Sequence, residues 1–303
     1  MKFLAKSGFS LIEVLVVVAI VVLLISILVP GIRGVVRMAG NLKQKTHYHS
    51  IEIALELFRD SYGDYPDSAT LPSQFTSSDQ ICGSQHLAEA VLGRDLKGFD
   101  PQTTWCASRE ESDDRRDIYA SSAKGSTAEE IKACNNRRKK PYMELKDEVG
   151  VYTIGEIYTD GIEPYSGSVY PSQNGYFAPV ITDVFDKKKI TLSNDKIIKC
   201  GMPVLYYKAD SLSEDWPSNN YYPGYGNDGK PLFIYNLFDN LPIMLLGPEG
   251  ADYENKKLIN DIFQRVTNPN MLYPAPYNPK KYILISAGWD GIYGTKDDVT
   301  NFD

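Results

Sequence analysis

A long uncharged run is the strongest feature of the hydropathy pattern. From Val14 to Ile32 the sequence contains no charged residue in 19 consecutive positions. At about 1.5 Å of rise per helical residue, this run extends roughly 28 Å, close to the hydrocarbon core of a bilayer at about 30 Å. We predict that it forms a membrane-spanning helix.

Apolar residues continue at helical spacing after this run. Four of them recur at intervals of three and four, with polar residues between them: Ile51, Ala54, Leu55 and Phe58. This spacing is typical of an amphipathic helix. Gly63 predicts its C-terminal stop, and Pro66 reinforces that stop. We expect one helix over residues 9–62, with its second half lying on a globular head. His47 and His49 are two positions apart and so point to different faces, and we interpret both as solvated.

About 240 residues follow the helix, which is enough for a core. They are rich in Tyr, Gly, Pro, Asn and Asp, and they contain short apolar runs of the kind that form strands between turns. These runs are Val149–Ile157, Val204–Tyr207, Leu232–Leu237 and Tyr282–Ile285. The predicted fold class is α+β, a long N-terminal helix packed on an antiparallel sheet head that contains a large loop-rich insertion.

The residues before the apolar run indicate its orientation. Lys2 and Lys6 favour a cytoplasmic N-terminus, which places everything after Ile32 across the membrane. A secretory signal is normally cleaved after its apolar region, whereas here the cleavage point suggested by the sequence precedes it, between Gly8 and Phe9. The apolar helix would then stay in the mature protein.

Glu13 is an unexpected residue at the start of an apolar helix. A carboxylate at mid-bilayer costs about 2.5 to 3.5 kcal/mol on insertion scales, so the residue needs a partner or an interface. Cleavage before Phe9 would create an α-amino group four residues from Glu13, and a neighbouring copy could offer that group to the carboxylate. A plain single-pass anchor with Glu13 near the headgroups is the simpler alternative.

These residues resemble a known family. The stretch from Gly8 to Glu13, GFSLIE, followed by an apolar helix, is similar to the class III signal of type IV pilins and type II secretion pseudopilins. The resemblance implies cleavage after Gly8 by a prepilin peptidase, N-methylation of Phe9, and a role for Glu13 in filament assembly. It also implies an inner-membrane assembly platform, minor pseudopilins and further copies of the chain as partners.

The same resemblance implies a domain organisation and a location. Residues 1–8 would be the leader, 9–62 the transmembrane and amphipathic helix, and 63–303 an extracytoplasmic head. The head would contain an insertion over about 75–279 and a C-terminal segment 286–303. The protein would be stored in the bacterial cytoplasmic membrane as a single-pass protein and then enter a periplasmic or extracellular filament.

Two further phrases support the pseudopilin branch. Gly63, Tyr65 and Pro66 match the Gly-x-Tyr-Pro turn that commonly follows the long helix in major pseudopilins. Near the C-terminus, Ser286 begins the phrase SAGWDG, which resembles the Ser-x-Gly-x-Asp-Gly segment of a calcium-binding loop in that family.

The C-terminal residues also suggest a cation site by their chemistry. Asp290, Asp297 and Asp298 flank two glycines, Gly291 and Gly294, and calcium accepts mixed carboxylate and carbonyl ligands in flexible geometry. The spacing differs from that of an EF-hand, and an acidic turn that binds nothing is the alternative. From the resemblance, the three aspartates are the expected side-chain ligands of calcium.

Four cysteines lie in the part expected outside the cytoplasm: Cys82, Cys106, Cys134 and Cys200. An even number in an oxidising compartment predicts two disulfides, with three pairings open. Nearest neighbours would pair Cys82 with Cys106 and Cys134 with Cys200. No CxxC spacing is present, which argues against a zinc site.

Charge and motif content exclude several function classes. The net charge of −7 argues against nucleic-acid binding by the surface as a whole. The sequence has no nucleophile elbow and no phosphate-binding glycine loop, so we expect a structural subunit of a pseudopilus or pilus and not an enzyme. The alternative is a minor pilin or tip adhesin whose enlarged head binds a surface, a sugar or a secreted substrate.

Overall fold

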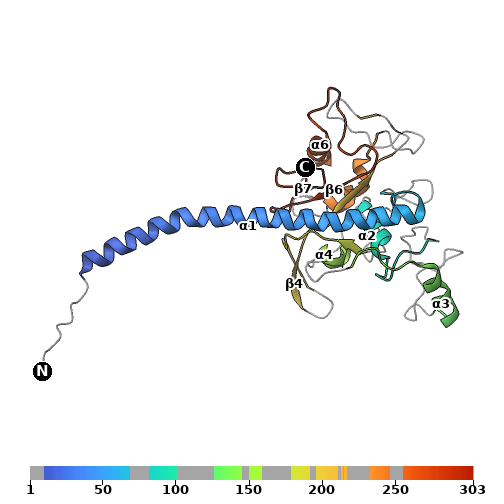
Figure 1. Cartoon of the computed structure of the whole chain (residues 1–303), viewed down its shortest axis with the longest axis horizontal. Helices are drawn as coiled ribbons and strands as arrows, with labels where there is room; N and C mark the ends of the chain where they lie inside the picture. Colours follow the sequence, from blue (N-terminus) through green and yellow to red (C-terminus); the bar gives the residue numbers. More distant parts are fainter. Residues whose placement is uncertain are drawn as a thin grey trace. The chain divides into compact units, whose positions relative to one another are not determined.

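The computed structural model describes most of the chain as two compact units, Met1–Leu42 and Lys43–Asp303. The described residues are 10–68, 82–101, 126–144, 150–158, 179–191, 196–210, 213, 215–216, 233–245 and 255–302. They form one very long helix, shorter helices and small antiparallel sheets (Figure 1). The predicted α+β class is confirmed.

Helix α1 runs from Leu11 to Tyr62. It contains an 18-residue window of mean hydropathy 3.3 and is long and apolar enough to cross a membrane. The helix ends where the sequence predicts. Gly63 has a φ of +91°, a left-handed conformation that glycine adopts without a steric penalty, and its N–H donates to the Arg59 carbonyl at 2.7 Å.

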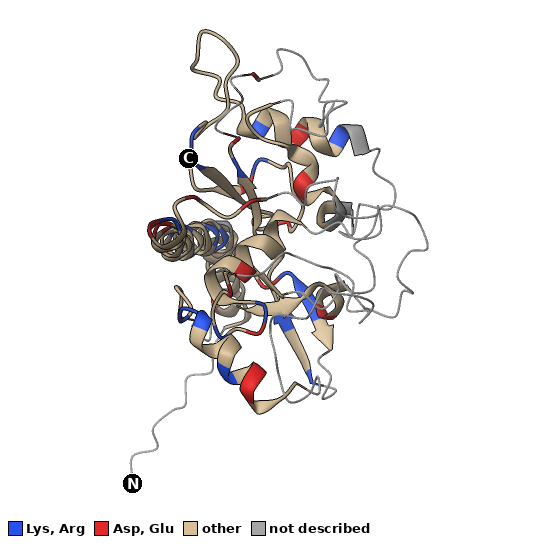
Figure 2. Cartoon of the chain, turned by 90° about the vertical axis from the view of Figure 1, so that its right-hand side faces the viewer, with Lys and Arg blue, Asp and Glu red and all other residues tan. Residues whose placement is uncertain are grey.

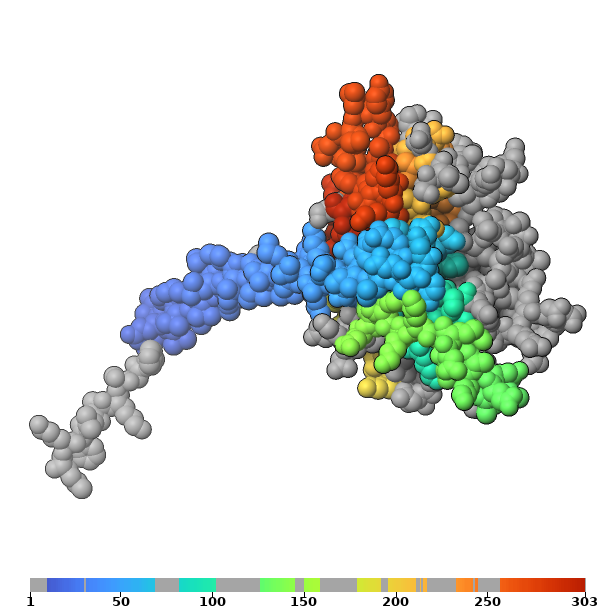
Figure 3. All heavy atoms as spheres, turned by 45° about the vertical axis from the view of Figure 1, so that its right-hand side comes forward, coloured from blue at the N-terminus to red at the C-terminus, as the bar shows by residue number. Residues whose placement is uncertain are grey.

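The C-terminal half of α1 belongs to the second unit and buries one face there. Ile51, Ala54 and Leu55 are fully buried. They lie in one core cluster with residues of α2 (Gly83–Leu92), β5 (Leu205–Lys208), β6 (Tyr282–Ser286) and β7 (Val299–Thr300). In Figure 3 this half of the helix, in light blue, lies between the orange-red segment 255–302 and the green segment near residue 140. The predicted amphipathic packing is therefore confirmed.

The described strands form three small antiparallel sheets. Their bounds are β1 Val151–Thr153, β2 Pro179–Ile181, β3 Lys188–Thr191, β4 Ile197–Cys200, β5 Leu205–Lys208, β6 Tyr282–Ser286 and β7 Val299–Thr300. β1 pairs with β2, β3 pairs with β4, and the third sheet has the order β5-β6-β7. In the third sheet Leu205 faces Ile285, and Ser286 faces Val299. In this sheet β6 and β7 border the C-terminal loop, and β5 pairs with β6 from a distant part of the sequence.

The remaining helices are short. They are α3 Ala128–Arg137, α4 Ile154–Tyr158, the 3₁₀-helix η3 Leu237–Asn240, α5 Leu241–Leu245 and α6 Asn255–Val266. Both α3 and α6 carry acidic and basic residues on the same helix, so charges of both signs are mixed on these elements (Figure 2).

Two of the predicted strands differ from the structure. The run 232–237 was predicted as a strand, but its described part is a bend that leads into η3, because the Asn236 side chain accepts the N–H of Phe238 and starts the helix. The run 149–157 is a strand only over β1. Thr153 and Glu156 then form a capping box: the Thr153 N–H donates to Glu156 at 2.8 Å, and the Glu156 N–H donates to the Thr153 hydroxyl at 3.2 Å.

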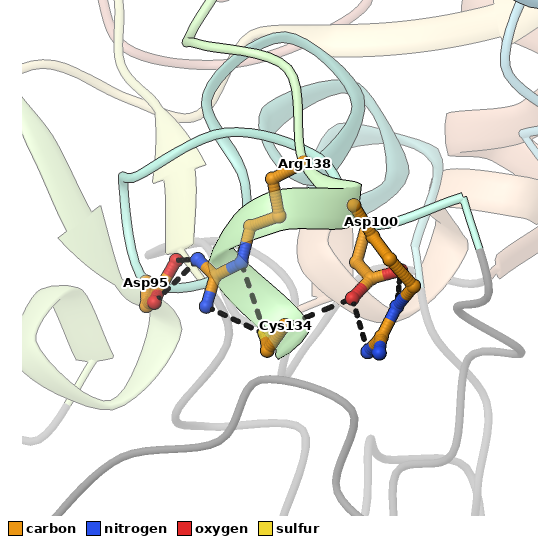
Figure 4. A network of polar contacts seen from close by, with 5 residues as sticks. Asp95, Asp100, Cys134 and Arg138 are labelled. Carbon is orange, nitrogen blue, oxygen red and sulfur yellow. Dashed lines mark hydrogen bonds and ion pairs between the residues drawn. The ribbon is translucent and has the colours of Figure 1, made fainter. Parts of the chain in front are cut away.

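A polar cluster joins α3 to the turn that follows α2. The Arg138 guanidinium donates to both carboxylate oxygens of Asp95 at 2.6 and 2.7 Å, and to the Cys134 sulfur at 3.0 and 3.1 Å. Arg137 donates to Asp100 at 2.9 Å. Figure 4 shows Arg138 lying between Asp95 and Cys134. A guanidinium and a carboxylate bonded in two places fix this helix more firmly than a single contact would.

Candidate functional site

The structure describes Glu13 but not the two residues at the predicted cleavage site. Gly8 and Phe9 lie outside the described residues. Glu13 is in the first turn of α1, and its carboxylate accepts the Ser10 N–H at 2.8 Å. The Ile12 N–H in turn lies 3.4 Å from the Ser10 hydroxyl. Ser10 and Glu13 therefore satisfy otherwise unpaired donors at the helix start, in the manner of a capping box.

This contact changes the interpretation of Glu13. In a single chain the carboxylate already has a hydrogen-bond donor, the backbone at the start of its own helix. The pattern S-x-x-E at residues 10–13 is typical of a capping box, so this contact could have been predicted from the sequence. An α-amino group from another copy would therefore share or replace the Ser10 contact.

The first unit exposes a continuous apolar surface. Every large apolar side chain described between Leu11 and Val36 is at least 41% exposed in the single chain. Contiguous apolar surface of this extent is rare on soluble monomers and indicates lipid or protein contact. This part of α1 therefore requires a membrane or further copies around it.

The C-terminal acidic loop connects β6 to β7, and its conformation is held from within. The Asp290 N–H donates to Asp297 Oδ2 at 2.9 Å, and the Thr295 hydroxyl donates to Asp297 Oδ1 at 2.7 Å. Gly288 has a φ of +65°, and a Cβ there would lie 2.1 Å from the Asp297 carbonyl oxygen. Glycine is required at this position because the two ends of the loop approach so closely.

Asp298 is the buried acid of this loop. It is 4% exposed, and its Oδ2 accepts the Gly294 N–H at 2.8 Å. Its Oδ1 has no hydrogen-bond partner among the described residues. Burial raises the pKa of Asp298 to about 8, against the lowering effect of the Gly294 N–H and of Arg265. A buried carboxylate with an open oxygen is a position where a cation would lower the free energy of the charged form.

The three predicted ligands are close along the loop but do not complete a site by themselves. Within the described residues, no three His, Cys, Asp or Glu side chains come together as a metal-binding group. Asp290 and Asp297 meet through a backbone N–H, whereas Asp298 is directed to Gly294. Calcium takes six to eight oxygens, so backbone carbonyls and water would have to supply most of them. The donor type and the open Asp298 oxygen fit calcium.

A second group of polar contacts joins α1 to the C-terminal strand and to Val184. The Tyr48 hydroxyl donates to the Val299 carbonyl at 2.8 Å, and the Asn301 side chain donates to Glu52 at 3.1 Å. The Gln44 side chain accepts the Val184 N–H at 3.0 Å. Sequence analysis missed these contacts because their partners lie as many as 251 positions apart. They make the C-terminal strand a neighbour of α1.

The interpretation of His47 as a solvated residue was wrong. Its side chain lies on the buried face of α1 and is 6% exposed, while His49 is exposed as expected. Burial lowers the pKa of His47 to about 4, with a small opposing effect from the Thr182 backbone. Asp183, which follows Thr182 in the sequence, is buried, and its carboxylate accepts a hydrogen bond from the Ser286 hydroxyl at 2.7 Å. Two residues of opposite charge type are thus buried where α1 meets residues 182–183.

Three of the four cysteines are described, and all three are buried: Cys82, Cys134 and Cys200. No disulfide joins any two of these three. The nearest-neighbour pair Cys134–Cys200 is therefore not bridged in this structure, where Cys134 contacts Arg138 and Cys200 lies in the main core cluster. Cys106 lies outside the described residues, but Cys82 carries a free thiol, so the predicted Cys82–Cys106 bond is not formed in this structure either.

Comparison with known proteins identifies the N-terminal segment. Residues 4–29 match the family described as the prokaryotic N-terminal methylation motif. This match confirms the predicted class III signal and is consistent with a type IV pilin-like chain. Together with the exposed apolar helix, it fits anchoring in the inner membrane. No match to the chain was found among curated proteins or among solved structures.

Proposed function

We propose that the chain is a structural subunit of a type II secretion pseudopilus or a related type IV pilus-like filament. The observation that carries this proposal is the match at residues 4–29 at the start of a helix whose large apolar side chains, as described from Leu11 to Val36, are exposed in the single chain. Lipid covers such a surface before assembly, and the helices of other copies cover it afterwards. The work of the protein is then assembly and not catalysis.

The chemistry of assembly begins with cleavage. Hydrolysis of the Gly8–Phe9 bond by a prepilin peptidase releases the basic leader and leaves an α-amino group on Phe9, which is then N-methylated. The amine keeps its positive charge after methylation. In an apolar setting it forms a charge-assisted hydrogen bond with the Glu13 carboxylate of a neighbouring copy, which is stronger than a neutral one. That contact would set the register between subunits on the inner-membrane platform.

The pseudopilin branch is favoured by the turn after the helix. Tyr65 is 6% exposed, accepts from Arg59 at 2.6 Å and donates to Glu56 at 2.8 Å, while the Tyr206 hydroxyl donates to the Pro66 carbonyl at 2.6 Å. The phrase Gly63-x-Tyr65-Pro66 thus fastens the end of the stem to the sheet. Minor pseudopilins would be the partners of such a subunit.

Calcium is the cofactor that we propose for the C-terminal loop. Asp290, Asp297 and Asp298 would supply its carboxylate oxygens, and the open Oδ1 of Asp298 is the observation that supports it. The ion would neutralise a cluster of acids and hold the β6–β7 connection closed. Its role is structural.

The function is tested by two substitutions of Glu13. Glu13→Gln keeps an oxygen that can accept the Ser10 N–H and so keeps the helix cap, but it removes the charge. Glu13→Ala removes both. We expect both variants to be cleaved and methylated, as checked by mass spectrometry, and both to form at least tenfold fewer surface filaments by electron microscopy.

The comparison separates the two roles of this carboxylate. If Glu13→Gln assembles like the unsubstituted chain while Glu13→Ala does not, the side chain only caps the helix and the proposed charge pairing is wrong. Normal filament numbers from both variants would contradict the proposed assembly role altogether.

A further inference from the structure

A groove of about 530 Å³ follows the outer side of α1 in the second unit. One wall is the helix, through Glu52, Ile53, Glu56, Leu57 and Asp60, and the other is formed by residues between 278 and 301. In Figure 3 this region of α1 borders the orange-red C-terminal segment. The groove therefore lies between the stem helix and the rim of the sheet.

The helix wall has two parallel rows of side chains. Glu52, Glu56 and Asp60 are spaced four apart and form an acidic row. Ile53 and Leu57 form an apolar row beside it, and they are 49% and 45% exposed. Lys281 is the basic residue of the opposite wall, so the groove carries more negative than positive charge. A helix with a basic row and an apolar row would complement it.

The chain itself contains such a helix in its first unit. Ile32 and Val36 are spaced four apart and are 51% and 48% exposed. Arg33 and Arg37 follow each of them by one position and are also exposed. Neither arginine has an ion pair within the part of the chain that the structure describes. The segment 32–37 therefore presents an apolar row beside a basic row.

The order of the two rows fixes the orientation of the match. Successive residues of an α-helix advance by about 100° around its axis. In the groove the acidic row precedes the apolar row by one position, and in the segment 32–37 the apolar row precedes the basic row. When two such helices face each other in parallel, apolar row meets apolar row and acid meets arginine. When they are antiparallel, arginine meets the apolar row.

We propose that this groove binds residues 32–37 of a second copy of the chain, in parallel, with Ile32 against Ile53 and Arg33 against Glu52. The proposal rests on the proposed function, because copies anchored with the same topology in one membrane can meet only in parallel. The two surfaces are different patches of one chain, so the contact is head-to-tail and does not close. Contacts of this type build open helical filaments.

The expected strength of one contact is modest. Glu56 already pairs with Arg59 at 2.6 Å and with Lys281 at 3.4 Å, and partly exposed ion pairs contribute only about 0 to 1 kcal/mol. The i, i+4 rows of the two helices would pack against each other as ridges and grooves. The charges would fix the register of the two helices and disfavour an antiparallel contact. Repetition along a filament makes such contacts sufficient.

The competing occupant is an exposed tip of the same head. Met271, Leu272 and Tyr273 are 56%, 91% and 78% exposed. This tip is apolar but carries no positive charge, so it complements only the Ile53 and Leu57 row. The segment 32–37 complements both rows and is therefore the occupant that the groove favours.

The test is disulfide trapping between two differently tagged full-length copies, expressed together in the organism that encodes the chain. One copy carries Ile32→Cys and the other Ile53→Cys. A disulfide needs Cα atoms within about 7 Å, so oxidation of isolated filaments should give a mixed-tag dimer. The unsubstituted pair measures the background from native cysteines.

Met38→Cys is the matched control for Ile32→Cys. Met38 is 75% exposed but lies six positions later, on the opposite side of the helix from the two rows. We expect at least fivefold more mixed dimer from the 32/53 pair than from the 38/53 pair. Equal yields, or a higher yield from Leu272→Cys with Ile53→Cys, would overturn the proposal.

Charge exchange gives a second measurement. Arg33→Glu in the Ile32→Cys copy should lower the 32/53 yield at least threefold, and adding Glu52→Lys to the Ile53→Cys copy should restore it. An unchanged yield in Arg33→Glu would overturn the proposed register. Filaments that form without the 32/53 dimer contradict this inference alone, whereas absence of filaments from the unsubstituted chain contradicts the proposed function.

Discussion

At the residue scale, the buried face of α1 contains a histidine, His47, for which the described residues provide no ion pair. His47 Nε2 has no hydrogen-bond partner among the described residues. Burial holds the pKa of His47 near 4, whereas burial raises the pKa of the neighbouring Asp183 to about 7 against three hydrogen bonds that favour its charged form. Both side chains are thus most stable in the folded chain when neutral.

These pKa values predict how stability changes with pH. The unfolded chain protonates His47 near pH 6.5 and the folded chain only near pH 4, so protons favour the unfolded state. The contribution of neutral His47 is fully present above pH 6.5 and is lost as the pH falls toward 4. By linkage this loss is on the order of 3 kcal/mol. Denaturant unfolding of the full chain in detergent, at a series of pH values, measures it.

His47→Gln is the comparison that isolates this effect. Glutamine does not titrate, so the variant should lose about 3 kcal/mol less than the unsubstituted chain between pH 7 and pH 4. Asp183 acts in the opposite direction: its contribution is complete below its unfolded pKa and is lost as the pH rises through 7. That effect is common to both chains and cancels in the difference. Parallel pH profiles for the two chains would show that His47 is not buried as described.

At the element scale, one hydroxyl fastens the stem helix to the C-terminal strand. Tyr48 is 2% exposed, and its hydroxyl donates to the Val299 carbonyl of β7. Tyr48→Phe leaves that buried carbonyl without this donor and should lower the free energy of unfolding by about 1 to 2 kcal/mol. Thermal and denaturant unfolding measure the change.

Tyr158→Phe provides the matched control. The Tyr158 hydroxyl is buried and has no hydrogen-bond partner among the described residues, so its removal should leave stability unchanged or slightly increased. Equal losses in the two variants would mean that the Tyr48 bond contributes nothing beyond the fit of the ring.

The elements differ in how far the sequence predicts them. The end of α1 and strands β5 and β6 follow from hydrophobic spacing and from Gly63, because local pattern decides them. The helix η3 and the start of α4 do not, since a side-chain cap from Asn236 or Thr153 overrides an apolar run that suits a strand. The S-x-x-E cap at Ser10 and Glu13 was equally local and could have been predicted.

Burial across long sequence separations was not predictable in this way. The spacing of two positions predicts that His47 and His49 lie on different faces of the helix, but only the fold shows that the face with His47 is buried. The same limit applies to the C-terminal loop. The aspartates and glycines indicate an acidic turn, whereas the orphaned oxygen of Asp298 depends on how β6 and β7 enclose it.

At the scale of the whole molecule, the C-terminal loop is connected to the stem helix within the second unit through strand β7. Asp298 precedes Val299, whose carbonyl accepts from Tyr48 on α1. A cation held by Asp290, Asp297 and Asp298 would thus stabilise the strand on which the helix docks. Binding of any ion to the folded state alone raises stability by about 2.7 kcal/mol when the free ion is at 100 times its dissociation constant.

We therefore predict that calcium stabilises the full chain in detergent and protects the docked half of the stem. Saturating calcium should raise the melting temperature by about 3 to 8 °C relative to chelator, and it should slow amide hydrogen exchange over residues 43–62. Asp298→Asn should abolish both effects. Asp60→Asn removes an exposed acid outside the loop and should retain them. If chelator leaves both the melting temperature and the exchange of the stem unchanged, the acidic loop binds no calcium and its aspartates serve only the turn.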